Sequence, residues 1–580
     1  MRSRLARADV NPVLTVFPTR RKPVAHETVH RRLSDSRGKI LADPWLFGIF
    51  LLLTASVLLF AVLPVLSVLR LAVTTGEGSV AQLLLHRLRA PLLWRTLGNT
   101  LLLGVASAVV STIVGFILAF ALTRTNLRGK AFIHLIALLP IISPPFVIAL
   151  SMILLFGRSG LVTKELLGIM GANVFGFHSL LFIQVLAFTP IAYLNMRGML
   201  MAIDSTLEDA AAVLGSSQWM IFSKITLPLS VPAILSSMLL VFVKSIEDFG
   251  NPLVIGGTFS TLAVEAYSQF IGYFNVGVGA MFASILLFPS LLAFMIHRYW
   301  ISARSYVTVT GKPAAQSIRL VSPLLVGPLG LFCYAFVGLI LALYGTVVAI
   351  SFTHIPGIDW SFTTEHYTRV FTAGLRPLWN SMTLAGVATP VTVFGGIAIA
   401  YILTRCSFAG SALLRWGTLI SFAAPGTIIG IGYVSLFNTP PLVLTGTALI
   451  IVAAIVVKTL QVGIEAGSNQ LRQIDPAMDE AALTLGASRM RTIGKITLPL
   501  LKPAIFTATA YAFTRSLTTL SAVIFLVSAN WTLITVTILN QVETLRMGLA
   551  AAYSVVLIAI VLALLGALQI VMGRTTYNDR

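Results

Sequence analysis

Residues 207–234 read LEDAAAVLGSSQWMIFSKITLPLSVPAI, and residues 478–505 read MDEAALTLGASRMRTIGKITLPLLKPAI. Gly215 and Gly486 hold the same place in the two stretches and lie 271 positions apart. The segment Lys-Ile-Thr-Leu-Pro-Leu occurs in both. Each stretch is mostly polar and lies between long apolar runs. A polar segment that occurs twice in register indicates a duplicated chain with two equivalent surfaces for partners.

The composition is that of an integral membrane protein. Of the 580 residues, 57% are hydrophobic and 10% are charged, and the mean hydropathy is +0.92. Soluble domains carry about 25% charged residues. Apolar runs of about 20 residues, which span about 30 Å of hydrocarbon as helices, recur along the chain. Backbone groups within lipid must be hydrogen-bonded inside their own segment, so we expect these runs to be helices in a bilayer.

The formal net charge of +20 does not indicate a protein that binds nucleic acid. The basic residues gather in alternate short loops and in the tail 1–43, as the positive-inside rule predicts. The tail is expected to be a disordered cytosolic segment, with contact to anionic lipid as the alternative. Cys333 and Cys406 lack metal-ligand spacing and are expected to be unpaired thiols, and no metal site is assigned.

The apolar runs form two sets of six, which predicts an all-α integral membrane fold of about twelve transmembrane helices. The first set falls near 46–70, 97–122, 131–156, 175–196, 231–255 and 277–296, and the second near 324–350, 378–403, 413–437, 442–464, 504–528 and 548–572. The predicted boundaries are a basic cytosolic tail 1–43, a first repeat 44–296, a cytosolic linker 297–320, a second repeat 321–573 and a C-terminal tail 574–580.

Sequence similarity between the two sets extends beyond the opening stretches. Two further matches share a separation of 281: LTRTNLRG at 122–129 with LTRCSFAG at 403–410, and Asn99-Thr100 with Asn380-Ser381. The order of the matches is the same in each half, which indicates a tandem duplication. An even number of helices per half gives both halves the same orientation. The halves are therefore predicted to be parallel repeats about an axis along the membrane normal.

The basic loops predict which side of the membrane each segment faces. Basic residues flank the loop at 122–129 and its repeat at 403–410, whereas the loops at 256–276 and 438–441 contain no Lys or Arg. By the positive-inside rule, both polar stretches, the linker and both termini are predicted to be cytoplasmic. The loop 71–96, with its three arginines, disagrees and is outweighed by its neighbours.

Each polar stretch is predicted to fold as a helix–turn–helix elbow on the cytoplasmic surface. Asp204 and Asp475 stand where a short helix begins and are suited to cap it. Gly215 and Gly486 permit the left-handed turn that ends this helix. A second amphipathic segment follows the turn in each copy.

Pro228 and Pro499 close the second segment of each elbow. Proline lacks a backbone N–H, so we expect each of them to break the helix before the next membrane span. The two predicted elbows cover 204–228 and 475–499.

The elbow sequence resembles the EAA motif of bacterial ABC importer permeases: E-A-A, three residues, G, nine residues, then I-x-L-P. The second copy matches at Glu480, Ala481, Ala482, Gly486, Ile496, Leu498 and Pro499, and the first at Ala210, Ala211, Gly215, Ile225, Leu227 and Pro228. The acidic position of the first copy is Asp209, preceded by Glu208, which is a small departure. In that family the elbow is the coupling helix that docks in a cleft of an ATPase subunit. The resemblance assigns this role to both copies and implies the type I ABC importer (MetI-like) fold.

The fused pair of repeats and the segment EDFGNPLVIGG at 247–257 resemble the iron(III)-type importer permeases. Permeases for thiamine, sulfate, polyamines and aminoethylphosphonate are close relatives and stay open as alternatives. The resemblance implies a multi-pass subunit of the bacterial inner membrane that is not itself an enzyme. Its implied partners are two ATPase subunits, which bind ATP and Mg, and an external solute-binding protein.

The chain has no G-x-x-x-x-G-K-[ST] phosphate-binding loop of its own, which agrees with ATP chemistry in another subunit. The competing interpretation is a secondary transporter of twelve helices with parallel halves, driven by an ion gradient. Such a transporter would not need the two elbows.

Among the charged residues within the predicted spans, Lys244, Glu247, Asp248 and Arg515 are candidates for a functional role. Lys244 lies 12 residues beyond Pro232, roughly 18 Å along a helix. Glu247 and Asp248 can pair with Lys244 on one helix face, whereas Arg515 has no acidic residue near it in sequence. Two interpretations stay open: the charges stabilise contact between the halves, or they line a transport path. A trivalent cation would prefer the two carboxylates, and an anion would prefer Arg515.

Overall fold

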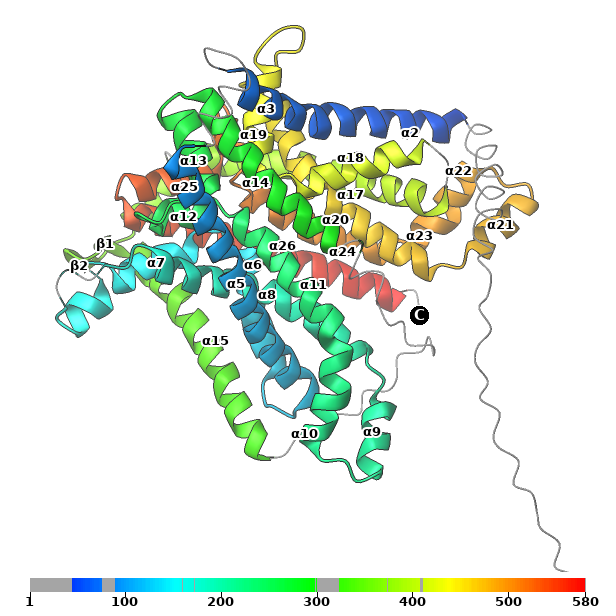
Figure 1. Cartoon of the computed structure of the whole chain (residues 1–580), viewed down its shortest axis with the longest axis horizontal. Helices are drawn as coiled ribbons and strands as arrows, with labels where there is room; N and C mark the ends of the chain where they lie inside the picture. The colour runs from blue at the N-terminus through cyan, green and yellow to red at the C-terminus, as the bar shows by residue number, and fades with distance from the viewer. Residues whose placement is uncertain are drawn as a thin grey trace, which may run out of the picture.

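The computed structural model describes residues 44–75, 89–158, 160–169, 171, 173–297, 299, 323–372, 374–406 and 410–578. The predicted tail 1–43, most of the predicted linker and residues 76–88 of the loop 71–96 lie outside the described residues. The described chain is almost entirely helical (Figure 1).

The elements of the first half are α2 (Pro44–Val57), η1 (Leu58–Val62), α3 (Leu63–Thr74), α5 (Pro91–Arg124), α6 (Lys130–Ile142), α7 (Val147–Phe156), η2 (Leu161–Leu166), α8 (Phe177–Ala202), α9 (Ser205–Val213), α10 (Gln218–Ile221), η3 (Phe222–Thr226), α11 (Leu227–Ile246), α12 (Gly250–Ile255), α13 (Leu262–Tyr267), η4 (Ser268–Gly272) and α14 (Val276–Ile296).

The elements of the second half are α15 (Pro323–Ser351), β1 (Thr353–Ile355), β2 (Asp359–Phe362), α16 (Glu365–Thr372), α17 (Leu375–Arg405), α18 (Ser411–Ala423), α19 (Gly426–Phe437), α20 (Ala448–Gln473), α21 (Pro476–Thr484), α22 (Arg489–Thr492), η7 (Ile493–Thr497), α23 (Leu498–Leu500), α24 (Lys502–Thr518), η8 (Val523–Phe525), α25 (Ile534–Glu543) and α26 (Met547–Asn578). The sequence did not predict the antiparallel β1–β2 hairpin.

Ten described helices are long and apolar enough to cross a membrane, or up to 12 if each strongly bent pair is one span. This confirms the predicted all-helical membrane fold. The third apolar run of each half is nevertheless not one straight helix. In the second half α18 and α19 meet at 111°, beside Pro425, and in the first half the chain breaks between α6 and α7, at Pro144 and Pro145. Prolines without an N–H explain why an uninterrupted apolar run does not continue as one helix.

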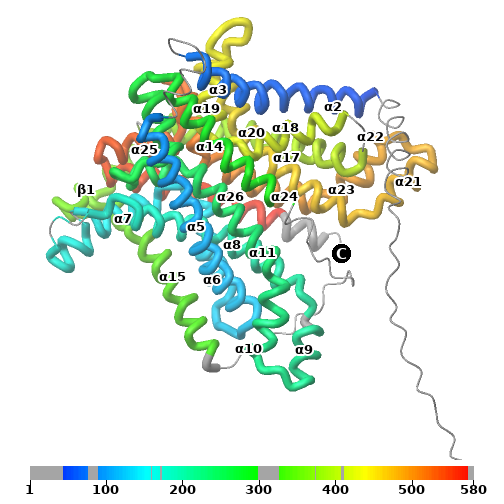
Figure 2. Tube along the Cα trace, in the orientation of Figure 1, coloured from blue at the N-terminus to red at the C-terminus, as the bar shows by residue number. Residues whose placement is uncertain are grey.

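The two halves interlock through their first helices. In the first half, α3 packs on α14 and also on α19 of the second half. In the second half, α15 packs on α26 and also on α6 and α7 of the first half. Figure 2 shows α2 and α3 (blue) beside α18 and α19 (yellow), and α15 (green) crossing to the blue and cyan helices. One hydrophobic core therefore runs through both halves.

The predicted helix breaks at Pro228 and Pro499 are wrong. A helix runs without a break from Gln218 to Ile246, through Pro228. A π-helical turn precedes each proline, η3 in the first copy and η7 in the second. The wider π-helical turn lets the helix accommodate a proline, which has no N–H to donate to the preceding turn. The second copy does bend, by 70°, but at Leu501, past Pro499 and just before α24.

Hydrogen bonds explain one of the repeated sequence matches. The hydroxyl oxygen of Thr100 on α5 accepts the backbone N–H of Leu262 at 2.9 Å. The hydroxyl oxygen of Ser381 on α17 accepts the backbone N–H of Ile534 at 2.8 Å. In each half this bond fixes the start of a short helix, α13 or α25, against the second long span. The repeat seen in the sequence is thus also a repeat of tertiary contacts.

Glycines bring the long helices of each half close together. On α17, a Cβ placed on Gly396 would lie 2.6 Å from the Cα of Gly463 on α20. On α5, a Cβ on Gly115 would lie 2.8 Å from the backbone N of Tyr193 on α8. Only glycine fits at these two crossings, because any side chain would meet backbone atoms.

Candidate functional site

Two regions of the described chain are candidate functional sites. One is the pair of polar elbows at the surface, and the other is a cavity with charged side chains between the two halves. Figure 1 places the first helices of the elbows, α9 and α21, at separate corners of the molecule. In each elbow an aspartate caps the first helix, as predicted. The Oδ1 atom of Asp204 accepts the N–H of Thr206, and Oδ1 of Asp475 accepts the N–H of Ala477, both at 2.9 Å.

The turn of each elbow has the predicted left-handed glycine. The φ angle is +84° at Gly215 and +83° at Gly486. The leucine before each glycine extends from the fold, since 85% of Leu214 and 88% of Leu485 is exposed. Two leucines at matching turns, each almost fully exposed, form apolar tips that no described part of the chain covers.

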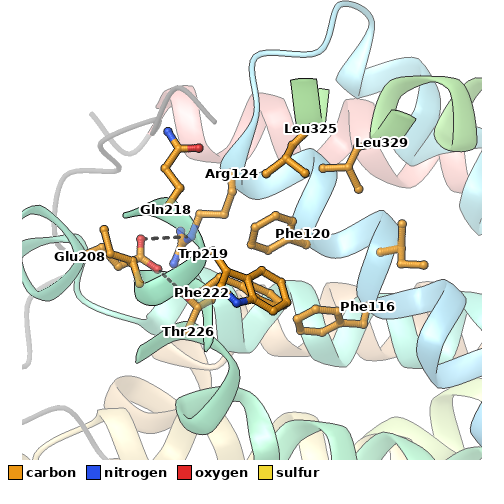
Figure 3. Close-up of a pocket in the computed structure, with 12 residues that line it drawn as sticks. Phe116, Phe120, Arg124, Glu208, Gln218, Trp219, Phe222, Thr226, Leu325 and Leu329 are labelled. Carbon is orange, nitrogen blue, oxygen red and sulfur yellow. Dashed lines mark hydrogen bonds and ion pairs between the residues drawn. The ribbon is translucent and has the colours of Figure 1, made fainter. Parts of the chain in front are cut away.

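The first elbow is fixed to the second long helix of its half through Glu208. A carboxylate oxygen of Glu208 lies 3.3 Å from Nε of Arg124, the last residue of α5. The other carboxylate oxygen accepts a hydrogen bond of 2.7 Å from the hydroxyl of Thr226 in η3 (Figure 3). Glu208 is buried, so this acid holds α5, α9 and the start of α11 together and does not face outward.

The second elbow repeats this arrangement through Asp479. Its carboxylate lies 3.5 Å from Nε of Arg405, the last residue of α17, and accepts a hydrogen bond of 3.2 Å from Thr497. Arg405 also donates to the backbone oxygens of Leu471 and Ile474 at the end of α20.

The acid that pairs with Arg405 is Asp479, whereas Glu480, the acidic residue of the predicted motif, is exposed and its coupling role stays a prediction. The 271-residue separation from Glu208 was the signal that could have identified Asp479.

The other predicted coupling residues lie around these anchors. Ala482 is buried, Asp209 and Ala211 are half-buried, and Ala210, Gly215, Pro228, Ala481, Gly486 and Pro499 are exposed. The structure thus gathers the predicted motif residues at two surface elbows. Their proposed role in coupling stays a prediction.

An apolar pocket of about 250 Å³ lies beside the first elbow (Figure 3). Aromatic side chains from α5 and the α10–η3 segment line it, with Leu325 and Leu329 of α15 on another side. At the corresponding place in the second half, Leu46 and Phe47 of α2 pack against Tyr401 and Ile493. The two elbows are therefore alike in their anchors and different in their apolar surroundings.

The second region is a cavity of about 540 Å³ between the halves. The first half contributes α11 and the segment after it, and the second half contributes α20 and α24. All four charged residues singled out from the sequence line this cavity: Lys244, Glu247, Asp248 and Arg515. They come from both halves, so the structure brings together residues that are up to 271 positions apart.

Glu247 connects the two halves within the cavity. Its carboxylate lies 3.1 Å from Nζ of Lys244 on α11 and 3.7 Å from Nζ of Lys458 on α20. Lys458 also donates a hydrogen bond of 2.7 Å to the backbone oxygen of Ala424. The expected pairing of Lys244 with Glu247 is present, and the contact with Lys458 was not foreseen. A lysine within the apolar run at 442–464 was the signal in the sequence.

Asp248 does not pair with Lys244 in the structure. Its carboxylate accepts hydrogen bonds of 2.9 Å from the side-chain amides of Gln184 and Asn251. Gln184 in turn accepts hydroxyl donors from Ser107 and Ser245. Asp248 therefore belongs to a buried polar network of the first half that borders the cavity.

Arg515 has no carboxylate within ion-pair distance among the described residues, as its sequence surroundings predicted. Its guanidinium lies 5.8 Å from the ring centre of Tyr511. Glu465 on α20 also lines the cavity and was missed by the sequence analysis. The side-chain amide of Gln461 donates a hydrogen bond of 3.1 Å to it.

A membrane-spanning helical fold, a two-fold repeat and a polar cavity between the repeats together define a solute-transport protein. Residues 111–305 and 392–577 both match the family of binding-protein-dependent transport system inner membrane components, and the chain belongs to this family. It is accordingly a multi-pass protein of the inner membrane.

Three relatives show what the chain is similar to. It is 36% identical over 545 residues to the ferric transport system permease protein FbpB of Actinobacillus pleuropneumoniae, covering 92% of this chain and 79% of the relative. It is 36% identical over 518 residues to the putative ferric transport system permease protein FbpB 1 of Haemophilus influenzae, covering 86% of this chain and 80% of that protein. The molybdenum transport system permease protein ModB of Haemophilus influenzae matches at 34% over 214 residues, 35% of this chain and 91% of that protein. Most of that permease thus matches about a third of this chain.

Proposed function

We propose that this chain is the transmembrane subunit of a binding-protein-dependent ABC importer that carries ferric iron across the bacterial inner membrane. The observation that carries the proposal is the 36% identity, over 92% of the chain, to a permease named for ferric transport. ATP is hydrolysed by separate subunits, and a solute-binding protein outside the membrane delivers the iron. Both termini and both elbows face the cytoplasm, as the basic loops predict.

The two elbows are the proposed contacts for two ATPase subunits. The exposed Leu214 and Leu485 supply apolar tips that fit a cleft, and aspartate caps make each short helix rigid. Glu208 and Asp479 connect each elbow to the end of a long membrane helix through Arg124 and Arg405. Movement of an ATPase subunit would therefore be passed to a span of each half.

The cavity between the halves is the proposed transport path. A charge buried in the membrane is costly unless it faces a partner or a water-filled space. Lys244, Glu247, Asp248 and Arg515 all lie at this cavity, and Lys458 and Glu465 lie there with them. The polar lining gives a hydrophilic solute a place within the hydrocarbon region.

Uptake of radioactive iron into membrane vesicles tests the proposal. The chain is co-expressed with its ATPase and supplied with iron-loaded binding protein. We expect uptake to require ATP and to persist when an ionophore collapses ion gradients. Uptake that needs the gradient and no ATP would favour the secondary transporter. ATP-dependent uptake of molybdate, sulfate, thiamine, a polyamine or aminoethylphosphonate in place of iron would support the ABC importer and contradict iron as its solute.

A further inference from the structure

We propose that iron passes through the cavity as a complex with an oxygen-donor anion, such as phosphate or citrate, and that Arg515 binds this anion. The inference rests on the proposed function, because it specifies the chemical form in which the iron travels. The part of the cavity lined by Lys244, Glu247 and Asp248 with Lys458 and Arg515 of the second half is called the deep end below.

The carboxylate of Glu247 lies beside two ammonium groups, one hydrogen-bonded to Oε2 and the other in ion-pair distance of Oε1, which accepts no hydrogen bond. One oxygen lies 3.1 Å from Lys244 and the other 3.7 Å from Lys458. A ferric ion that took Glu247 as a ligand would have to displace two ammonium groups and lie beside both of them. That arrangement is electrostatically unfavourable, because like charges repel at short range.

The carboxylate of Asp248 is likewise engaged. Two side-chain amides donate to its Oδ2 atom, and the backbone N–H of Asn251 lies 3.4 Å from Oδ1. Among the described residues, no cluster of three or more histidine, cysteine, aspartate or glutamate side chains could hold a metal ion. The described side chains of the deep end therefore do not offer a bare trivalent cation the oxygen ligands that it prefers.

Arg515 is the group at the deep end that is left to bind a ligand. It is half-buried, faces the cavity and has no carboxylate partner in the described chain. The nearby hydroxyls of Thr518 and Thr519 donate to backbone oxygens of their own helix, at 2.9 and 2.6 Å, so their hydrogens are committed. A guanidinium with free N–H groups binds carboxylate and phosphate oxygens in a two-pronged geometry.

Ion pairing at the deep end leaves Arg515 as the cation without a carboxylate partner among the described residues. Glu247 lies beside Lys244 and Lys458, and Glu465 lines the same cavity, so three acidic side chains balance three cationic ones. An iron complex that presents anion oxygens to Arg515 gives this guanidinium a partner, whereas a bare ferric ion does not.

Reconstituted vesicles holding the complete transporter test the inference. The binding protein is loaded with radioactive iron together with radioactive phosphate or citrate, and the ATP-dependent entry of both labels is measured. We expect one of the anions to enter with the iron. Removal of a charge-assisted contact in Arg515→Gln should lower the entry of both labels about tenfold or more. Arg515→Lys, which keeps the charge, should retain more activity, and Arg95→Gln, an exposed arginine on α5, should match the unmodified chain.

The outcomes separate this inference from the proposed function. ATP-dependent entry of iron with neither anion, unchanged in Arg515→Gln, would overturn the inference and keep the iron importer. Entry of an anion without iron would support the anion site and overturn iron as the solute. If neither label enters the vesicles, the anion site is tested by calorimetric titration of the detergent-solubilised transporter with ferric citrate and with phosphate. Heat of binding that is lost in Arg515→Gln, at an unchanged melting temperature, supports the anion site, and no difference between the two proteins overturns it.

Discussion

At the residue scale, the two turn glycines have backbone angles that other residues rarely adopt. A side chain with a Cβ atom in the left-handed region costs about 1–2 kcal/mol, and β-branched residues are the least suited to it. Nothing lies within 4 Å of a Cβ built on Gly486, so the cost is conformational and not steric. We expect Gly486→Val to reduce iron uptake and recovery of the co-purified ATPase. Gly486→Asn is the control, because asparagine tolerates this conformation, and equal behaviour of the two variants would contradict the argument.

The acidic anchors give a second prediction at the residue scale. The side chains of Asp479 and Arg405 are 14% and 12% exposed, so their ion pair is largely shielded from water. Asp479→Ala should lower stability by about 2 kcal/mol, because a charged hydrogen-bonding group loses its partner. Glu480→Ala, at the neighbouring exposed position, should leave the melting temperature unchanged.

Thermal unfolding of the purified transporter gives the melting temperatures of Asp479→Ala and Glu480→Ala. Charge exchange in Arg405→Asp with Asp479→Arg should restore part of the lost stability. A larger loss of stability in Glu480→Ala than in Asp479→Ala would show that the anchor is assigned to the wrong acid.

At the scale of elements, the crossing of α17 and α20 depends on contact between backbones. Gly396→Val should force these helices apart, because the new side chain would meet the backbone of Gly463. Overpacking of this kind costs about 1–3 kcal/mol, and we expect a lower melting temperature together with lower uptake. Gly386→Val in the same helix is the matched control, since nothing lies within 4 Å of a Cβ there. Similar melting temperatures for the two variants would refute the close contact.

At the scale of the whole molecule, one chain already holds both elbows and both sides of the cavity. We expect the solubilised complex to contain one copy of this chain and two ATPase subunits. The interlocking of α3 with α19 and of α15 with α6 and α7 means that neither half is complete without the other. Native mass measurement of the complex checks the stoichiometry, and two copies of this chain per complex would contradict it.

Much of this protein could be predicted from its sequence. Apolar runs specify helices because backbone groups in lipid must bond within their own segment. The fixed separations of 271 and 281 revealed the repeat, and the aspartate caps and turn glycines specified the elbows through local backbone chemistry. Those features depend on residues close together in the chain, so a linear pattern is enough to find them.

The tertiary structure decided what depends on distant contacts. Pro228 and Pro499 follow the same Lys-Ile-Thr-Leu segment, yet the helix is unbroken in one copy and bends at Leu501 in the other, where the first copy has Ser230. Asp479 and not Glu480 became the anchor because the end of α17 brings Arg405 to it. Lys458 lies beside Glu247 across the interface between the halves, although the two residues are 211 positions apart in the chain. No local pattern contains such a pairing, because it joins the end of a helix in one half to a helix of the other half across the cavity.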